Sequence, residues 1–190
     1  AVLLAAPAEL TWRDLVADDF PQWTTTEGEG TFTFDRGELH GSGPSSRNVF
    51  LVSPDIHRDF VLECEVLAEA GSNSGIQIRS HINDQGRLSG PQVEIETTDR
   101  RWSGGLYDEG RRGWLDPLEG DEEAMAAFRI GEWNHYRIEC LGPRYRTWVN
   151  GRPCTDFMDV EDLDGHIAFQ IHGGAFCDVR WRNIRIADLG

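Results

Sequence analysis

Three short segments of this sequence, 76–79, 92–96 and 166–172, alternate apolar side chains with side chains that form hydrogen bonds or transfer protons. Because successive residues of a β-strand point to opposite faces, each segment would have one apolar face and one hydrogen-bonding face. The hydrogen-bonding set consists of Gln77, Arg79, Gln92, Glu94, Glu96, His166, Gln170 and His172. Carboxylates and imidazoles transfer protons, whereas amides and guanidinium groups hold vicinal hydroxyls. The pattern predicts a sheet face for a polyhydroxylated ligand, with an ordinary amphipathic sheet as the alternative.

A glycine-rich segment, 102–114, lies between two of the expected strands and carries three aromatic rings. We expect this segment to be a loop beside the polar face, with Trp102, Tyr107 and Trp114 near the ligand. Exposed rings next to a polar cleft stack against sugar rings, although rings at such positions also serve as core or turn packing.

The elements that must position these groups are short strands separated by turns. The clearest strand is 60–66, in which Phe60 and Leu62 share one face and Glu63 lies on the other. Asn150-Gly151 predicts a hairpin turn, and residues 117–127 favour a short helix. Many short strands with abundant glycine predict an all-β domain. Further strands are expected at 30–34, 38–41, 48–52, 76–80, 92–97, 133–141, 145–150, 166–172 and 178–187.

The charge of the chain excludes some classes of partner. Its 190 residues include 33 acidic side chains against 18 arginines and no lysine, for a formal net charge of -15. Nucleic acids and anionic membranes are bound through positive surfaces, so we expect neither as a partner. No stretch approaches the ~20 apolar residues of a membrane-spanning helix, so no membrane insertion is expected. A neutral carbohydrate is compatible with this charge, and the oligomeric state stays open.

The cysteines and the N-terminal segment bear on the compartment. Cys64, Cys140, Cys154 and Cys177 show no zinc-binding spacing, and they are either buried thiols or, after export, one or two disulfides. Residues 1–11 form an apolar lead-in, either a signal-peptide remnant or an edge strand, and residues 12–190 are expected to form one domain. We expect an exported bacterial protein, periplasmic or extracellular, with the cytoplasm as the alternative.

Several segments together resemble a known family. The segment 71–76 reads Gly-Ser-Asn-Ser-Gly-Ile and is followed by Arg79-Ser80. Further matching segments follow in order at 105–107, 131–134, 150–151, 165–172 and 182–186. This ordered set resembles the 3-keto-disaccharide hydrolase domain family over nearly the whole chain, from 12 to 189. One difference lies at 92–96, where much of the family reads Glu-x-Gln-x-x-Asp and this chain reads Gln-Val-Glu-Ile-Glu, so carboxylate and amide exchange places.

The resemblance implies an all-β fold, a two-sheet antiparallel jelly-roll sandwich of the concanavalin A-like lectin and glucanase type, with one or two short helices in loops. It also implies an enzyme of the glycoside hydrolase or lyase type, acting on glycosides whose C3 hydroxyl has been oxidised to a ketone. The ketone acidifies the C2 proton, so a base can remove it, the C1 substituent leaves, and water adds back. That chemistry needs a base, a stabiliser for the enolate oxygen and an acid for the leaving oxygen.

We assign these roles to residues as hypotheses. His172 or Glu94 would be the base. Arg79 would anchor the enolate or a hydroxyl group, and Glu96 would be the acid or an orienting group. No cofactor is required, but a divalent metal ion, if present, would be held by Glu94, Glu96 and His172, and a structural calcium ion is a separate alternative. The expected substrate-binding residues are Gln77, Gln92, Gln170, Tyr107, Trp102, Trp114 and Asn73.

Two other functions stay open for this sequence. The same type of fold also serves as a non-catalytic, lectin-like carbohydrate-binding module. A protein-interaction sandwich of the laminin G kind would instead need an exposed apolar patch. The mixture of arginine, glutamate and histidine favours the enzyme, because a lectin site seldom needs a base next to a fixed cation.

Overall fold

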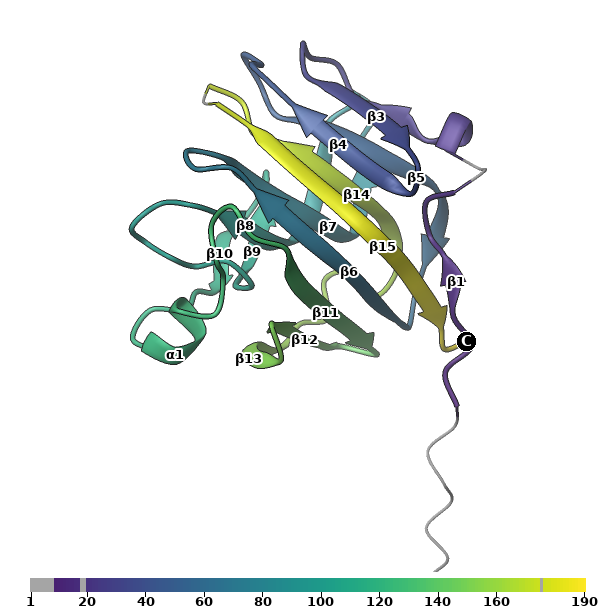
Figure 1. The fold of residues 1–190 in the computed structure, drawn as a ribbon. Helices are drawn as coiled ribbons and strands as arrows, with labels where there is room; N and C mark the ends of the chain where they lie inside the picture. Colours follow the sequence, from purple (N-terminus) through teal and green to yellow (C-terminus); the bar gives the residue numbers. More distant parts are fainter. Residues whose placement is uncertain (1–8, 18–19, 175) are drawn as a thin grey trace, which may run out of the picture.

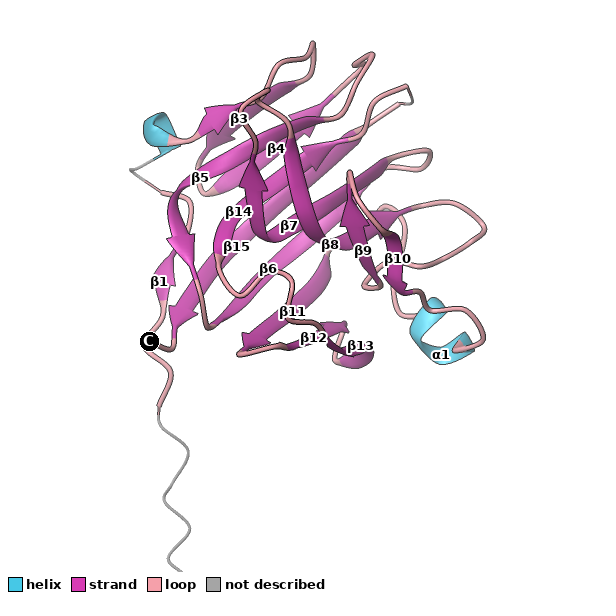
Figure 2. Ribbon diagram, turned by 180° about the vertical axis from the view of Figure 1, so that it is seen from behind, coloured by secondary structure: helices cyan, strands magenta, loops and turns pink. Residues whose placement is uncertain are grey.

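The computed structural model describes residues 9–17, 20–174 and 176–190, and this part of the chain consists almost entirely of β-strands. The first eight residues of the expected lead-in lie outside the described residues. Two antiparallel sheets pack face to face, as Figure 1 and Figure 2 show from opposite sides. The predicted all-β sandwich of two antiparallel sheets is confirmed.

Each sheet joins strands that lie far apart in the sequence. The first sheet, in front in Figure 1, has the order β13 (Arg152–Met158), β12 (Arg144–Val149), β11 (Asn134–Leu141), β6 (Phe60–Ala68), β15 (Asp178–Asp188), β4 (Glu38–Ser42) and β3 (Thr31–Asp35), with β1 (Arg13–Asp14) paired to β15. The second sheet, in front in Figure 2, has the order β10 (Gly113–Asp116), β9 (Leu106–Glu109), β8 (Leu88–Glu96), β7 (Asn73–Ile82), β14 (Gly165–Ile171), β5 (Val49–His57) and β2 (Thr24–Thr25).

Helical structure is confined to two short pieces of the described chain. One is the 3-10 helix η1 (Phe20–Gln22), and the other is α1 (Glu122–Met125), which lies inside the stretch where the sequence predicts a short helix. Asp121 caps α1 by accepting a hydrogen bond from the backbone N–H of Ala124 at 3.0 Å. No helix in the described ranges has the length and apolar character needed to cross a membrane.

The core lies between the two sheets and follows from the alternation of the strands. In β6, Phe60 and Leu62 are completely buried, whereas Glu63 lies on the other face and binds Arg137 and Arg185, each at 2.6 Å. The second sheet contributes its own apolar face to this core through Ile76, Ile78, Val93, Ile95, Ile167, Phe169 and Ile171. Its opposite face, called here the outer face, therefore carries the alternating polar side chains.

Arg79 departs from this alternation, and its expected place on the outer face is wrong. A register shift interrupts the pairing of β7 between Gln77 and His81, and Arg79 has a positive φ of 48°. This bulge turns the side chain away from the outer face. Its Nε donates to the carbonyl of Arg58 at 2.7 Å, and its Nη2 pairs with Asp59 at 2.9 Å. Arg79 is completely buried, and its guanidinium carbon lies 5.1 Å from the centre of the Tyr145 ring. Arg79 is therefore a structural residue of the sandwich.

The segment 102–114 also differs from its expected form. Much of it is a β-hairpin, β9 and β10, which extends the second sheet at its edge beyond β8. Leu106 within it is fully buried, and Tyr107 is paired with Gln92 of β8 in the register. Periodicity did not reveal the hairpin because glycine and charged residues interrupt the apolar alternation.

All four cysteines are free thiols in the structure. Cys64 and Cys140 are buried in the core, and burial raises the pKa of the Cys140 thiol to about 12. Burial likewise raises the pKa of Cys154 to about 11. A thiol that does not ionise near neutral pH is a weak nucleophile, so these side chains act as packing groups rather than reactive ones.

Replacing Arg79 by leucine is expected to lower the free energy of unfolding by about 3 kcal/mol, because the Asp59 carboxylate and two backbone carbonyls would lose a buried partner. Urea denaturation followed by tryptophan fluorescence measures this change. The control is Arg129→Leu, in which the arginine side chain is 67% exposed, and a change within about 0.5 kcal/mol is expected. Equal effects of the two substitutions would contradict a structural role for Arg79.

Candidate active site

A pocket of about 250 Å³ opens on the outer face of the second sheet, near the end where the hairpin β9–β10 joins it. The side chains come from β7, β8, β9 and β10, from the residue before β5 and the residue after β14, and from the connection that follows β8. The residues that line it are Asn48, Asn73, Gln92, Glu94, Arg100, Tyr107, Glu109, Trp114 and His172.

Glu94 is the most strongly perturbed group of this pocket. Its side chain is almost completely buried, and its carboxylate accepts hydrogen bonds from Asn73 Nδ2 and Gln92 Nε2, both at 3.1 Å. The nearest guanidinium nitrogen of Arg100 is 3.7 Å away. Burial raises the pKa of Glu94 to about 8, despite the opposing effect of the amide hydrogen bonds. At neutral pH the group is therefore largely a neutral carboxylic acid.

The Asn-Ser-Gly segment at the start of β7 explains how Glu94 and Gln92 fit side by side. Asn73 supplies one hydrogen bond to Glu94, and Ser74 Oγ donates to the backbone carbonyl of Gln170 at 2.6 Å, which ties β7 to β14. Gly75 stands opposite Glu94 in the register, and a Cβ there would lie 2.3 Å from Cδ of Gln92. The absence of a side chain at position 75 thus leaves space for the Gln92 amide.

Arg100 is held in place beside Glu94 by hydrogen bonds to a carboxylate and by contacts with two tryptophan rings. Glu96 accepts three hydrogen bonds from its guanidinium, at 3.0 Å and 3.2 Å from Nε and at 2.8 Å from Nη2. It accepts another from the backbone N–H of Trp102 at 2.7 Å. The guanidinium carbon lies 5.0 Å from the centre of the Trp102 ring and 4.8 Å from that of Trp114. Arg100 therefore presents a fixed positive charge to the pocket.

The aromatic rings form one packed group. Trp114 makes edge contacts with Trp102 and Tyr107, with ring centres 4.9 Å and 5.2 Å apart. Trp114 and Tyr107 line the pocket, whereas Trp102 supports Arg100 from outside the lining. Burial raises the pKa of Tyr107, with the nearby carboxylate of Glu109 adding to the effect, so the phenol stays protonated and can donate a hydrogen bond.

Glu109, the last residue of β9, is a second carboxyl group that lines the pocket. Asn48 Nδ2 donates to its Oε1 at 3.1 Å, and Gln170 Nε2 donates to its Oε2 at 3.4 Å. Burial raises the pKa of Glu109, which favours the neutral acid. Two buried polar atoms nearby, Oε1 of Gln170 and Nδ1 of His172, have no hydrogen-bond partner in the structure. Such groups need a partner, and a polar ligand or water can supply it.

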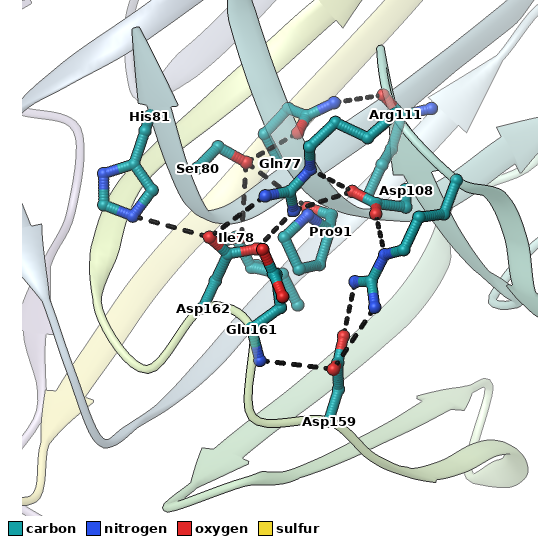
Figure 3. Close-up of polar contacts among 12 residues, drawn as sticks. Gln77, Ile78, Ser80, His81, Pro91, Asp108, Arg111, Asp159, Glu161 and Asp162 are labelled. Carbon is teal, nitrogen blue, oxygen red and sulfur yellow. Dashed lines mark hydrogen bonds and ion pairs between the residues drawn. The ribbon is translucent and has the colours of Figure 1, made fainter.

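An ion-pair network fixes the hairpin that carries Tyr107 and Glu109. Asp108 lies between these two residues in the sequence, and its side chain is completely buried. It accepts a hydrogen bond from Nε of Arg111 at 2.9 Å and also pairs with Arg112. Figure 3 shows Arg111 between Asp108 and Asp162. Arg112 also pairs with Asp159. Asp159 and Asp162 belong to the connection between β13 and β14, so the hairpin is tied to a distant part of the chain.

The structure brings together most, though not all, of the residues predicted from the sequence. Gln77 does not line the pocket, but its buried amide forms a 2.6 Å hydrogen bond with that of Gln92, and Gln170 reaches the site through Glu109. Glu96 and Trp102 contact Arg100 instead of lining the pocket. Arg79 lies elsewhere, as described above. The predicted residues that do line the pocket are Asn73, Gln92, Glu94, Tyr107, Trp114 and His172.

Three lining residues, Asn48, Arg100 and Glu109, were missed in the sequence. Glu109 lies two residues beyond Tyr107 on a strand, so alternation along β9 would have found it if the hairpin had been recognised. Arg100 comes from an irregular connection, and Asn48 from the residue before β5. No periodic signal marks either position, because only the packing of other elements brings them to the pocket.

A metal site does not form from the residues suggested for it. Among the described residues, no three His, Cys, Asp or Glu side chains are grouped closely enough to hold a metal ion. Glu96 is already engaged by Arg100 and by the backbone of Trp102. The set Glu94, Glu96 and His172 is therefore not assembled as a ligand sphere.

The burial of Glu94 predicts how the stability of the protein depends on pH. The folded state raises the pKa of Glu94 from 4.5 to about 8, so its contribution to stability is complete below pH 4.5 and is lost as the pH rises through 8. Glu94→Gln has no such proton to lose. We expect this variant to gain about 4 kcal/mol relative to the wild type between pH 4.5 and pH 9, because each pKa unit corresponds to about 1.4 kcal/mol.

Urea denaturation at both pH values measures this gain. The control is Glu69→Gln, because Glu69 is exposed and its substitution should have the same small effect at either pH. A difference between Glu94→Gln and wild type that does not change with pH would contradict a buried neutral acid.

Comparisons with known proteins agree with this fold. The chain is similar to a Parabacteroides distasonis ATCC 8503 protein named as a candidate glycosyl hydrolase, with 19% identity, a TM-score of 0.68, and 94% of this chain and 100% of that chain covered. It is also similar to a Bacillus subtilis protein of unknown function with a galectin-like fold (14% identity, TM-score 0.67, 94% and 95% covered). A third similar structure is the carbohydrate-binding module CBM66 from Bacillus subtilis (15% identity, TM-score 0.63, 87% and 95% covered).

Identities this low show the fold alone, and they confirm the predicted two-sheet jelly-roll sandwich of the concanavalin A-like lectin and glucanase type. No curated protein sequence matches the chain. The family model for the 3-keto-alpha-glucoside-1,2-lyase-like domain matches residues 11–187. Because this match spans nearly the whole chain, the protein belongs to this carbohydrate-active, glycosyl hydrolase-like family.

Proposed function

We propose that the protein cleaves glycosides that carry a ketone at C3, by eliminating the C1 substituent and then adding water. The observation that carries this proposal is the pairing of a buried, neutral Glu94 with the fixed guanidinium of Arg100 in one pocket that His172 also lines. An acid and a cation held side by side suit an oxygen that becomes negatively charged during the reaction. The family match supports the same substrate class.

The base in this proposal is His172. Glu94 is mostly protonated below pH 8, so it is poorly suited to accept a proton at neutral pH. An imidazole accepts a proton readily under these conditions, and Nδ1 of His172 has no partner within the protein. His172 would remove the C2 proton, and the electron pair would pass into the C3 carbonyl to form an enolate.

Glu94 and Arg100 stabilise the enolate oxygen. A carboxylic acid kept neutral by burial donates a hydrogen bond to a developing oxyanion, and the adjacent guanidinium adds positive charge. Glu96 acts as the orienting group in this arrangement, because its hydrogen bonds with Arg100 and the Trp102 backbone fix the guanidinium. Arg100 thus takes the role that the sequence suggested for Arg79.

Glu109 protonates the leaving oxygen. Burial raises its pKa and so favours the acid form, and Asn48 and Gln170 hold its carboxyl group in place. When the C1–O bond breaks, the Glu109 proton goes to the departing oxygen and a double bond forms between C1 and C2. Water then adds across that bond, with its hydroxyl to C1, a proton from His172 to C2, and its remaining proton to Glu109. The net reaction is hydrolysis.

The first test is release of the aglycone from a panel of 3-keto-glycosides and their unoxidised parents. We expect release from the keto forms only, and a loss of about 10²–10⁴-fold in kcat for His172→Ala. His135→Ala is the matched control, because this histidine is half-exposed beside Glu63 on the first sheet, and it should leave kcat unchanged. Binding of both forms without release would assign the pocket to a lectin-like module.

The pH dependence of kcat distinguishes the roles of Glu94. As a hydrogen-bond donor, Glu94 is active below its pKa, so the rate is expected to fall as the pH rises through about 8. Glu94→Gln keeps a neutral donor and should retain measurable activity without that fall. A wild-type rate that instead rises up to pH 8, together with an inactive Glu94→Gln variant, would identify Glu94 as the base.

A further inference from the structure

A second, larger cavity lies directly beside the candidate site. Its volume is about 840 Å³, and it shares two lining residues, Asn48 and Glu109, with the smaller pocket. The hydrogen bond between these residues therefore marks the junction of the two spaces. The rest of the lining includes the β7–β8 turn at residues 83–87 and the hairpin turn at Gly110 and Arg111.

The floor of this larger cavity is apolar. Phe50 and Leu88 line it, and both are buried in a small hydrophobic cluster with Val52 and Ala168 that is separate from the main core. The remaining walls of the larger cavity are mostly polar, and the smaller pocket is lined by polar side chains and two aromatic residues, with no aliphatic side chain. A sugar ring with many hydroxyls suits the polar pocket, whereas a flat and less polar group suits the apolar floor.

Arg87 at the rim of this cavity differs from every other arginine in the described part of the chain. Each of the others pairs with a carboxylate, as expected for a chain with a formal net charge of -15. Arg87 lies in the β7–β8 turn, is exposed, lines the cavity, and makes no ion pair. Its guanidinium is therefore free to bind an anionic group of a ligand in the cavity.

We propose that the larger cavity holds the leaving group of the substrate and favours an aryl aglycone bearing a carboxylate, which Arg87 binds. This inference rests on the proposed function, in which Glu109 protonates the leaving oxygen. Because Glu109 stands at the junction, a sugar in the smaller pocket would direct its C1 substituent into the larger one. The aryl ring would then lie over Phe50 and Leu88, with its carboxylate toward Arg87.

The test compares the 3-keto-glucosides of 4-hydroxybenzoate, 4-hydroxybenzamide and methanol, which differ in charge and in the presence of a ring. The wild type is expected to cleave the benzoate derivative with a kcat/KM about 5–10-fold above that of the benzamide, as one charge-assisted contact would give. Arg87→Gln should bring this ratio to about 1 and leave the benzamide and methyl derivatives unchanged. The wild-type preference should also weaken in high salt, because Arg87 is exposed.

Arg129→Gln is the control, because Arg129 is an exposed arginine outside both cavities, and it should keep the wild-type ratio. A ratio of 1 in the wild type, or one that Arg87→Gln leaves unchanged, would overturn the inference while the proposed function stands.

If the wild type cleaves none of these compounds, the proposed function fails, and the cavity is judged by binding alone. Calorimetry with the unoxidised glucosides of 4-hydroxybenzoate and 4-hydroxybenzamide then decides. Tighter binding of the benzoate, lost in Arg87→Gln, would support the acid-binding cavity. Equal affinities, or no binding of either compound, would overturn it.

Discussion

The outer face of the second sheet carries polar side chains that are themselves buried, and the site depends on how these groups satisfy one another. A buried amide or carboxylate without a partner is costly, so the groups must form a connected set. Gln77 contacts Gln92, and Gln92 and Asn73 both donate to Glu94. This chain of contacts keeps the Glu94 carboxyl group in place and leaves it too poorly solvated to ionise easily. The unusual acid is thus a consequence of sheet packing.

The charges around the site are arranged to hold one cation and one acid in defined positions. Glu96 is separated from Glu94 by a single residue, yet the two carboxyl groups have different surroundings. Glu96 meets a guanidinium and a backbone N–H, whereas Glu94 meets two neutral amides. The same residue type therefore serves as a fixed counter-charge in one position and as a neutral donor in the other. Differences in local solvation and partners, rather than residue identity, separate these roles.

The fold by itself leaves the choice between binding and catalysis open, because the similar structures include a carbohydrate-binding module as well as a protein named as a candidate glycosyl hydrolase. What favours catalysis is the site. A pocket that only recognised sugar hydroxyls would have little need of two carboxylic acids with raised pKa values beside a histidine whose ring nitrogen lacks a partner. Because the adjoining cavity shares Glu109 with the pocket, a substrate that filled both would extend past this acid.

The sequence alone determined the sandwich class and much of the polar face, because period-2 alternation in segments such as 92–96 directly records which side chains share a face. Gln92 and Glu94 are examples, and both line the pocket. Alternation fails wherever the backbone leaves the regular pleat. The bulge at Arg79 turned a predicted site residue into a structural one, and the hairpin at 106–116 carried Glu109 into the pocket without a recognisable periodic signal. Arg100 comes from an irregular connection, and only the tertiary structure brings its guanidinium beside Glu94. The physical reason is that this placement depends on contacts between segments, which no local sequence pattern encodes.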